Sequence, residues 1–402
     1  MKRSTRTIVI LMLGAAVSAS AYRPNTAAQP APFKAGEDLR PLYATPDDIA
    51  DGKRLADSAC AGCHGVDGIS TTTGIPDLAG QRPAYLYAEL KAYQTGARVN
   101  AAMNTSVRFI SDEALVKAAA YYASLDPPPP ASGAPTYFDP VQAGRTAAAA
   151  CGGCHGETGV SKTPGTPSLA GLTPQYLTTA MKAYRSGQRK NETMKAMLAA
   201  AGDADIDHLA LFYALQKPMP AQTPAAGNPD AGKADAAGCA GCHGDRGVSS
   251  NPATPSIAGQ DAGYLAAALQ AYKDGARADE AMKGVAASLD DAKIKDIAAY
   301  FAAQQPRAPN VRPPQSPQQW VQKCDRCHGI NGNSTDPRIP ALAAQRVEYL
   351  ETVLRDYQTH ARANAEMAAM SAGLGEDDIK NLANYYSHQK ARAVVFMTVP
   401  GK

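Results

Sequence analysis

A five-residue pattern that occurs four times along this chain of 402 residues constrains its fold more than any other feature. The pattern is Cys-x-x-Cys-His, and it begins at Cys60, Cys151, Cys239 and Cys324, at nearly equal intervals. Each interval has the length of a small domain, and the four patterns use all eight cysteines of the chain. The sequence is therefore a tandem array of four repeats that share one fold.

Other residues keep a fixed distance from the first cysteine of each repeat, without a single insertion. With that cysteine numbered as position 0, a proline occupies position 16, tyrosines occupy 25 and 33, an arginine 38, a methionine 43 and an aromatic pair 61 and 62. The prolines are Pro76, Pro167, Pro255 and Pro340, and the arginines are Arg98, Arg189, Arg277 and Arg362. The tyrosines at position 25 are Tyr85, Tyr176, Tyr264 and Tyr349.

The periodicity within a repeat predicts helices. In the first repeat Leu86, Leu90 and Tyr93 form an i, i+4, i+7 stripe, and the other repeats have apolar residues at the same positions. We expect further helices before each cysteine pair and before each aromatic pair. Because no alternating strand pattern appears, the predicted class is all-α. Proline-rich linkers separate the repeats, and the predicted domains span residues 46–126, 138–217, 227–305 and 315–390.

The N-terminal segment, residues 1–21, predicts a secretory signal peptide. Lys2, Arg3 and Arg6 precede an apolar run, and Ala19 and Ala21 fit a cleavage site after Ala21. The alternative is an uncleaved N-terminal anchor, through which the protein would associate with a membrane. The formal charge is +3, and cleavage would remove three positive charges and leave a neutral chain. Net charge therefore gives no support to nucleic-acid binding, and we expect an exported, periplasmic protein.

Cys-x-x-Cys-His fits three chemistries. A zinc site needs about four Cys or His ligands around one metal, and each repeat offers two cysteines and one reliably placed histidine. A redox dithiol of the thioredoxin type expects strands around it, which these repeats lack. The third chemistry is covalent haem attachment, in which two thiols bind one porphyrin edge and the following histidine ligates the iron. Four copies that exhaust the cysteines of an exported chain favour haem.

At these motifs the sequence resembles the class I c-type cytochromes, and among them the c4-type proteins, which carry two such domains. The motifs are "CAGCHG…IPDLAGQRPAYL…M", "CGGCHG…TPSLAGLTPQYL…M", "CAGCHG…TPSIAGQDAGYL…M" and "CDRCHG…IPALAAQRVEYL…M". The resemblance covers most of residues 46–390, but the chain has four repeats where the c4 pattern has two. It implies four covalently bound haem c groups with their iron, one in each repeat.

The predicted haem site of each repeat comprises two cysteines, one histidine and one methionine. The thioether anchors would be Cys60, Cys63, Cys151, Cys154, Cys239, Cys242, Cys324 and Cys327. The iron ligands would be His64, Met103, His155, Met194, His243, Met282, His328 and Met367. Methionine at position 43 is the only sulfur or imidazole candidate for the sixth ligand in all four repeats. In the resembled family this methionine lies on the loop before the last helix.

Several supporting residues have alternative interpretations. The methionines could be core filler, and Met197 and Met370, which recur in two repeats only, are interpreted as packing residues. In class I cytochromes the carbonyl of the proline at position 16 accepts the histidine Nδ1 proton. The arginines at position 38 could either bind haem propionates or be solvated cations near a helix C-terminus.

The ligand set predicts an electron carrier and not an enzyme. Its partners would be redox proteins: a donor dehydrogenase or quinol-oxidising complex, and an acceptor oxidase or reductase. One alternative is a haem peroxidase or thiosulfate-oxidising cytochrome, which would need an open iron site or a cysteine ligand. Another is the cytochrome subunit of a membrane-bound dehydrogenase. The C-terminal apolar stretch, Val394 to Val399, is too short to span a membrane and is weak evidence for a surface anchor.

Overall fold

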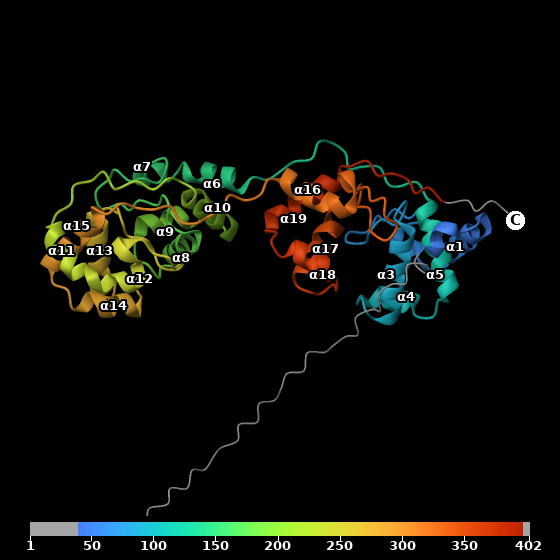
Figure 1. Ribbon diagram of the computed structural model, residues 1–402, viewed down its shortest axis with the longest axis horizontal. Helices are drawn as coiled ribbons and strands as arrows, with labels where there is room; N and C mark the ends of the chain where they lie inside the picture. Colours follow the sequence, from blue (N-terminus) through green and yellow to red (C-terminus); the bar gives the residue numbers. More distant parts are fainter. Residues whose placement is uncertain (1–38, 397–402) are drawn as a thin grey trace, which may run out of the picture. The chain divides into compact units, whose positions relative to one another are not determined.

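The computed structural model describes residues 39–396 as an all-helical protein (Figure 1). The predicted signal peptide lies outside the described residues. Between residues 39 and 396, the only β-type pairing is one isolated bridge between Arg189 and Arg277. No helix in this range has the length and hydrophobicity needed to cross a bilayer. The structure therefore confirms the all-α class.

Each repeat contains the helices that its sequence predicts. The first repeat has α1 (Pro46–Ala59), α2 (Ala61–His64), α3 (Pro83–Thr95), α4 (Ala101–Val107) and α5 (Asp112–Ser124). The second has α6 (Pro140–Ala148), α7 (Gly152–His155), α8 (Pro174–Arg185), α9 (Glu192–Leu198) and α10 (Asp203–Ala214). The third has α11 (Pro229–Asp235), α12 (Ala240–His243), α13 (Ala262–Lys273), α14 (Glu280–Ala287) and α15 (Asp291–Ala302). The fourth has α16 (Pro317–His328), α17 (Val347–Gln358), α18 (Ala365–Ser371) and α19 (Glu376–Ser387).

The chain divides into two compact units. Among the described residues, unit 1 comprises those up to Pro130, Cys327–Ala372 and those from Lys390 onward. Unit 2 comprises Ala131–Arg326 and Gly373–Gln389. Unit 1 therefore combines the first repeat with the central part of the fourth, while unit 2 contains the whole of the second and third repeats.

Within unit 1, the segment that follows the haem-motif histidine in the first repeat packs against its equivalent in the fourth. Gln81 Nε2 donates a hydrogen bond to the carbonyl of Ala341 at 2.9 Å, and Gln345 Nε2 donates one to the carbonyl of Asp77 at 2.9 Å. Both glutamines occupy position 21 of their repeats. The two repeats therefore use the same surface, in the reciprocal manner of an isologous contact.

Within unit 2, the second and third repeats make a similar contact with a single glutamine. Gln260 Nε2 donates to the carbonyl of Ser168 at 2.9 Å, and its Oε1 accepts from the amide of Ser168 at 2.7 Å. The equivalent position in the second repeat is Leu172. Figure 1 shows the helices of these two repeats beside one another. The repeats thus pair in a nested order, first with fourth and second with third.

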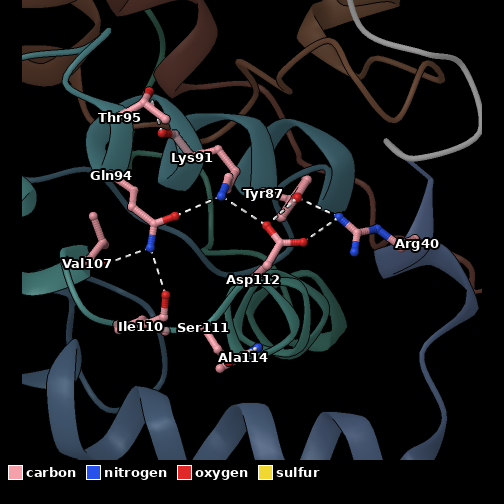
Figure 2. Close-up of polar contacts among 10 residues, drawn as sticks. All are labelled: Arg40, Tyr87, Lys91, Gln94, Thr95, Val107, Ile110, Ser111, Asp112 and Ala114. Atoms are coloured by element: carbon pink, nitrogen blue, oxygen red, sulfur yellow. Dashed lines mark hydrogen bonds and ion pairs between the residues drawn. The ribbon is translucent and has the colours of Figure 1, made fainter.

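The last helix of the first repeat is fixed at its N-terminus by a polar network (Figure 2). The Ser111 hydroxyl accepts from the amide of Ala114 and caps α5. In the next position, Asp112 accepts hydrogen bonds from Tyr87 at 2.8 Å and Arg40 at 2.9 Å and forms an ion pair with Lys91 at 3.1 Å. The network therefore ties α5 to α3 and to the 3-10 helix Arg40–Tyr43.

The first and last helices of the first repeat approach each other at a glycine. α1 packs against α5, and a Cβ added at Gly52 would lie 2.1 Å from the carbonyl oxygen of Lys117 and 2.9 Å from the Tyr121 Cβ. Gly144 and Gly232 occupy the same kind of contact in the second and third repeats. Only glycine allows the two helix backbones to come this close.

We expect Gly52→Ala to destabilise the protein by about 1 to 3 kcal/mol, because the added methyl group overpacks a contact that backbone atoms form. Chemical denaturation followed by circular dichroism would measure the loss. Gly284→Ala is the matched control, since Gly284 lies in a helix and has open space around its Cα. A Gly52→Ala protein as stable as the Gly284→Ala protein would contradict the close contact.

The C-terminal tail contributes to the core of unit 1. Val394 and Phe396 pack against the hydrophobic cluster of the first repeat, which includes Leu115 and Tyr122. Asn333 Oδ1 accepts from the amide of Arg392 at 2.8 Å and holds the chain just before this contact. Two residues of the C-terminal apolar stretch thus pack within the protein, which further weakens the evidence for a surface anchor.

Candidate functional site

The four Cys-x-x-Cys-His patterns all lie on or beside short helices. The first cysteine of each pattern is half-buried, the second is exposed, and none forms a disulfide. In the first three repeats, the second cysteine and the histidine lie on α2, α7 and α12, and in the fourth repeat both cysteines and the histidine end α16. Both cysteines of every repeat therefore lie within four residues of the histidine and outside any disulfide.

Each motif histidine is buried and its ring orientation is fixed. The four imidazoles are 7 to 8% exposed, and each Nδ1 donates to the carbonyl of the proline at position 16 of its repeat. These bonds are His64 to Pro76 at 3.1 Å, His155 to Pro167 at 2.8 Å, His243 to Pro255 at 2.9 Å and His328 to Pro340 at 3.0 Å. A bond at Nδ1 leaves Nε2 as the metal-binding nitrogen and raises its basicity.

Burial also favours the neutral form of two of these imidazoles. It lowers the pKa of His64 and of His155, and the hydrogen bonds to the proline carbonyls oppose this effect only in part. A neutral imidazole is the form that binds a metal ion. His64 and His155 therefore favour the form that binds iron before the cofactor is attached.

The glycine that ends each motif allows the chain to turn sharply after the histidine. Gly65 has φ +81°, and a Cβ at this position would lie 2.1 Å from the carbonyl oxygen of Ile69. Gly156, Gly244 and Gly329 have φ between +76° and +80° in the other repeats. This left-handed conformation is accessible to glycine at low cost, so the turn that carries the chain from histidine to proline requires the sequence Cys-His-Gly.

The methionines at position 43 lie in the first turn of a short helix, where the family pattern predicts a loop. These helices are α4, α9, α14 and α18, and each begins with an Asn or Asp side chain that caps the methionine amide. The bonds are Met103 to Asn100 at 3.1 Å, Met194 to Asn191 at 2.9 Å, Met282 to Asp279 at 2.9 Å and Met367 to Asn364 at 2.8 Å. The constant Asn or Asp three residues before the methionine is the signal that sequence reasoning missed.

The structure separates these methionines from the two others that were candidates. Met103, Met194, Met282 and Met367 are all partly buried, and Met103 packs against the same hydrophobic cluster as Cys60. Met197 and Met370 are instead 49% and 41% exposed. The interpretation of Met197 and Met370 as packing residues is wrong, since they lie on the solvent side of their short helices.

Two of the arginines at position 38 are not the solvated cations that one interpretation proposed. Arg277 and Arg362 are 8% and 6% exposed. Each donates to tyrosines at position 25: Arg362 to Tyr85 at 3.0 Å, Arg277 to Tyr176 at 3.2 Å and to Tyr264 at 3.4 Å. The pairing of repeats covers these guanidinium groups, which the sequence of one repeat could not predict.

The residues present fit a covalently attached haem. The cysteines form no disulfide, the imidazoles are oriented, and the buried Nε of Arg277 has no hydrogen-bond partner. A buried guanidinium with an unused donor suits an anionic group such as a propionate. Haem c takes only its histidine ligand to iron from this motif, because the two cysteines bind the porphyrin. No group of three or more His, Cys, Asp or Glu side chains from residues 39–396 is arranged to hold a metal ion.

Comparison with known proteins agrees with this chemistry. The model of the cytochrome c family matches residues 49–126, 141–212 and 230–304, and the model of cytochrome c oxidase, cbb3-type, subunit III matches residues 314–385. The chain therefore belongs to the cytochrome c family. It is a multi-domain class I c-type cytochrome, and it carries four covalently bound haem c groups at its four Cys-x-x-Cys-His motifs.

Some relatives match about two fifths of this chain over most of their own length. Cytochrome c4 of Thiocapsa roseopersicina is 33% identical over 183 residues, which is 41% of this chain and 94% of that protein. A thiosulfate dehydrogenase electron acceptor of Thiomonas intermedia (strain K12) is 33% identical over 172 residues, 39% of this chain and 79% of that protein. The solved structure of reduced recombinant cytochrome c4 from Pseudomonas stutzeri aligns with a TM-score of 0.37 at 28% identity, over 41% of this chain and 98% of that chain.

Proposed function

We propose that this protein is a periplasmic tetrahaem cytochrome that carries electrons through four haems with His/Met ligands, in four domains at residues 46–126, 138–217, 227–305 and 315–390. The observation that carries the proposal is the repetition of one site. In each repeat a buried histidine, fixed by a proline carbonyl, is followed by a partly buried methionine on a capped helix. Haem c with two such ligands supplies reversible one-electron chemistry.

Each protein group has one role in this proposal. The eight cysteines anchor the cofactor, and the imidazoles of His64, His155, His243 and His328 provide the proximal ligand. The thioethers of Met103, Met194, Met282 and Met367 provide the sixth ligand. A thioether is a soft, neutral donor that favours reduced iron and raises the potential. By occupying the sixth position in every repeat, the methionines exclude exogenous ligands, so the sites favour electron transfer over oxygen or peroxide chemistry.

The partners in this proposal are redox proteins. One relative is named a thiosulfate dehydrogenase electron acceptor, which supports a dehydrogenase as the donor. A quinol-oxidising complex is the other donor class, and an oxidase or reductase would be the acceptor. The proposed export depends on the N-terminal segment, which would be removed after Ala21 or would remain as an anchor.

A role as the cytochrome subunit of a membrane-bound dehydrogenase is the second candidate. Electron transfer through the same four sites would serve either role, but a subunit needs a means of attachment. The described tail gives little support, because Val394 and Phe396 pack against the first repeat. A haem enzyme is supported still less, since every repeat keeps its methionine and no cysteine remains as an axial ligand.

A spectroelectrochemical titration of the purified protein tests the proposal. We expect a pyridine haemochrome assay to give four haem c per chain, and all four to be reduced and reoxidised reversibly in one-electron steps. The ferric protein should bind neither cyanide nor peroxide rapidly, because all four sixth positions are occupied. Rapid binding of either ligand by one haem would contradict the carrier function and favour an enzyme.

A further inference from the structure

Glu89 is a half-buried carboxylate that only one repeat possesses. It occupies position 29 of the first repeat, and the equivalent residues in the other repeats are Ala180, Ala268 and Val353. Its carboxylate forms an ion pair with Arg98 of its own repeat and, at 2.8 Å, with Arg362 of the fourth repeat. A single carboxylate thus joins the position-38 arginines of both repeats in unit 1.

The paired arginines of unit 2 have no such partner. Arg277 donates only to tyrosine hydroxyls and leaves its Nε unpaired, and Arg189 lies over the rings of Tyr176 and Tyr184. In the described part of the chain neither arginine has a carboxylate within ion-pair distance. The two units therefore share one arginine and tyrosine framework and differ in the carboxylate at its centre.

Buried tyrosines at position 25 lie beside these charges in both units. Burial strongly raises the pKa of Tyr85, and Glu89 adds to the increase while Arg362 opposes it. In unit 2, burial raises the pKa of Tyr264, whereas Arg277 and Arg189 outweigh burial at Tyr176 and leave its pKa lowered. At Tyr85, Glu89 therefore opposes the positive potential of Arg362, as expected of a carboxylate that is ion-paired with both arginines.

Glu89 lies close to the haem site of the first repeat. Its helical neighbours Leu90 and Tyr93 pack against the hydrophobic cluster that also receives Cys60 and Met103. Its ion-pair partner Arg98 lies five residues before Met103, in the segment between α3 and α4. Its guanidinium lies 4.6 Å from the centre of the Tyr93 ring. One side chain, that of Arg98, thus separates the carboxylate from Tyr93, which packs against the same cluster as Met103.

Little water screens these charges. The side chains of Glu89, Arg98 and Arg362 are 23%, 15% and 7% exposed. A charge at such a site interacts with its surroundings several-fold more strongly than a charge in bulk water. Net charge near the iron is one of the main determinants of haem potential, because a negative charge stabilises the ferric state.

From this geometry we propose that Glu89 sets the reduction potentials of the haems held by the first and fourth repeats, lowering both relative to the same sites without the carboxylate. The inference rests on the proposed electron-carrier function. It predicts the effect of removing Glu89. It does not predict which unit holds the haems of higher potential, because other buried charges also differ between the units. Unit 1 also has Arg82 and Asp77 near its contact, and unit 2 has Asp261.

The test compares redox titrations of Glu89→Gln, Arg362→Gln and the unmodified protein, each with four haems. In the titration each haem takes one electron from the mediator, Fe(III) becoming Fe(II). Loss of the carboxylate should raise the equilibrium constant for reduction of two haems by roughly threefold to tenfold and leave the other two unchanged. Loss of the guanidinium in Arg362→Gln should lower the equilibrium constant for reduction of the same two haems.

Glu113→Gln is the matched control. It removes one carboxylate from the same repeat, at a side chain that is 80% exposed. It should change the equilibrium constant for reduction of every haem by less than twofold. The proposal is overturned if Glu89→Gln shifts no haem, shifts all four equally or behaves as Glu113→Gln does. It is also overturned if Glu89→Gln and Arg362→Gln shift the potentials in the same direction, as a loosened contact would. Irreversible titration of the unmodified protein would instead contradict the proposed function.

Discussion

Replacing Cys239 and Cys242 by serine should give a protein with three haems and an unfolded third repeat. The core of this repeat is small: its buried cluster contains three alanines and only Leu265, Ile297 and Phe301 as larger side chains. The porphyrin of the attached haem is the largest apolar group available to complete this core. Removing one buried Phe or Trp costs about 3 to 5 kcal/mol, so losing a whole haem should cost more than about 5 kcal/mol.

Three measurements follow the loss of this haem. A haemochrome assay should give three quarters of the original haem c, far-UV circular dichroism should lose helix, and limited proteolysis should cleave within residues 229–302. The double variant Asp245→Asn/Arg246→Gln is the matched control, because it changes two exposed residues directly after the motif. A serine variant that keeps its helix content and resists protease would show that the polypeptide core suffices.

The helices of each repeat could be predicted because short-range patterns determine them. The stripe of Leu86, Leu90 and Tyr93 predicts α3, and Ser111 before Asp112 and Glu113 begins α5 as an N-cap should. The hydrogen bond from His64 to Pro76 followed from the family pattern and the constant spacing of histidine and proline in every repeat. These features depend on residues close together in the sequence, so one repeat contains all the information.

The pairing of repeats could not be predicted, because the sequence of a single repeat does not determine which other repeat it contacts. Gln81, Gln260 and Gln345 occupy one position in three repeats, and each could reach a backbone group of any other repeat. The burial of Arg277 and Arg362 follows from that pairing, so one repeat could not distinguish a buried arginine from a solvated one. Glu89 was visible as a residue unique to the first repeat, but its partner Arg362 belongs to the fourth, with two whole repeats between them in the sequence.

Met194→Ala should abolish one quarter of the methionine-to-ferric-iron charge-transfer absorbance and lower the potential of one haem. The thioether stabilises the ferrous state, and a water molecule or an empty position in its place does so less. Absorption spectroscopy of the ferric protein would measure the band, and a redox titration would measure the potential. We expect four haems to remain, because the cysteines and His155 are unchanged.

Met197→Ala provides the matched control in the same short helix. Met197 lies three residues after Met194 and is 49% exposed, whereas Met194 is partly buried and capped by Asn191. We therefore expect the Met197→Ala protein to keep the full band and all four potentials. Loss of the band in Met197→Ala, with Met194→Ala unaffected, would assign the sixth ligand to Met197 instead of Met194. Because position 43 holds methionine in every repeat, that result would also contradict the assignments of Met103, Met282 and Met367.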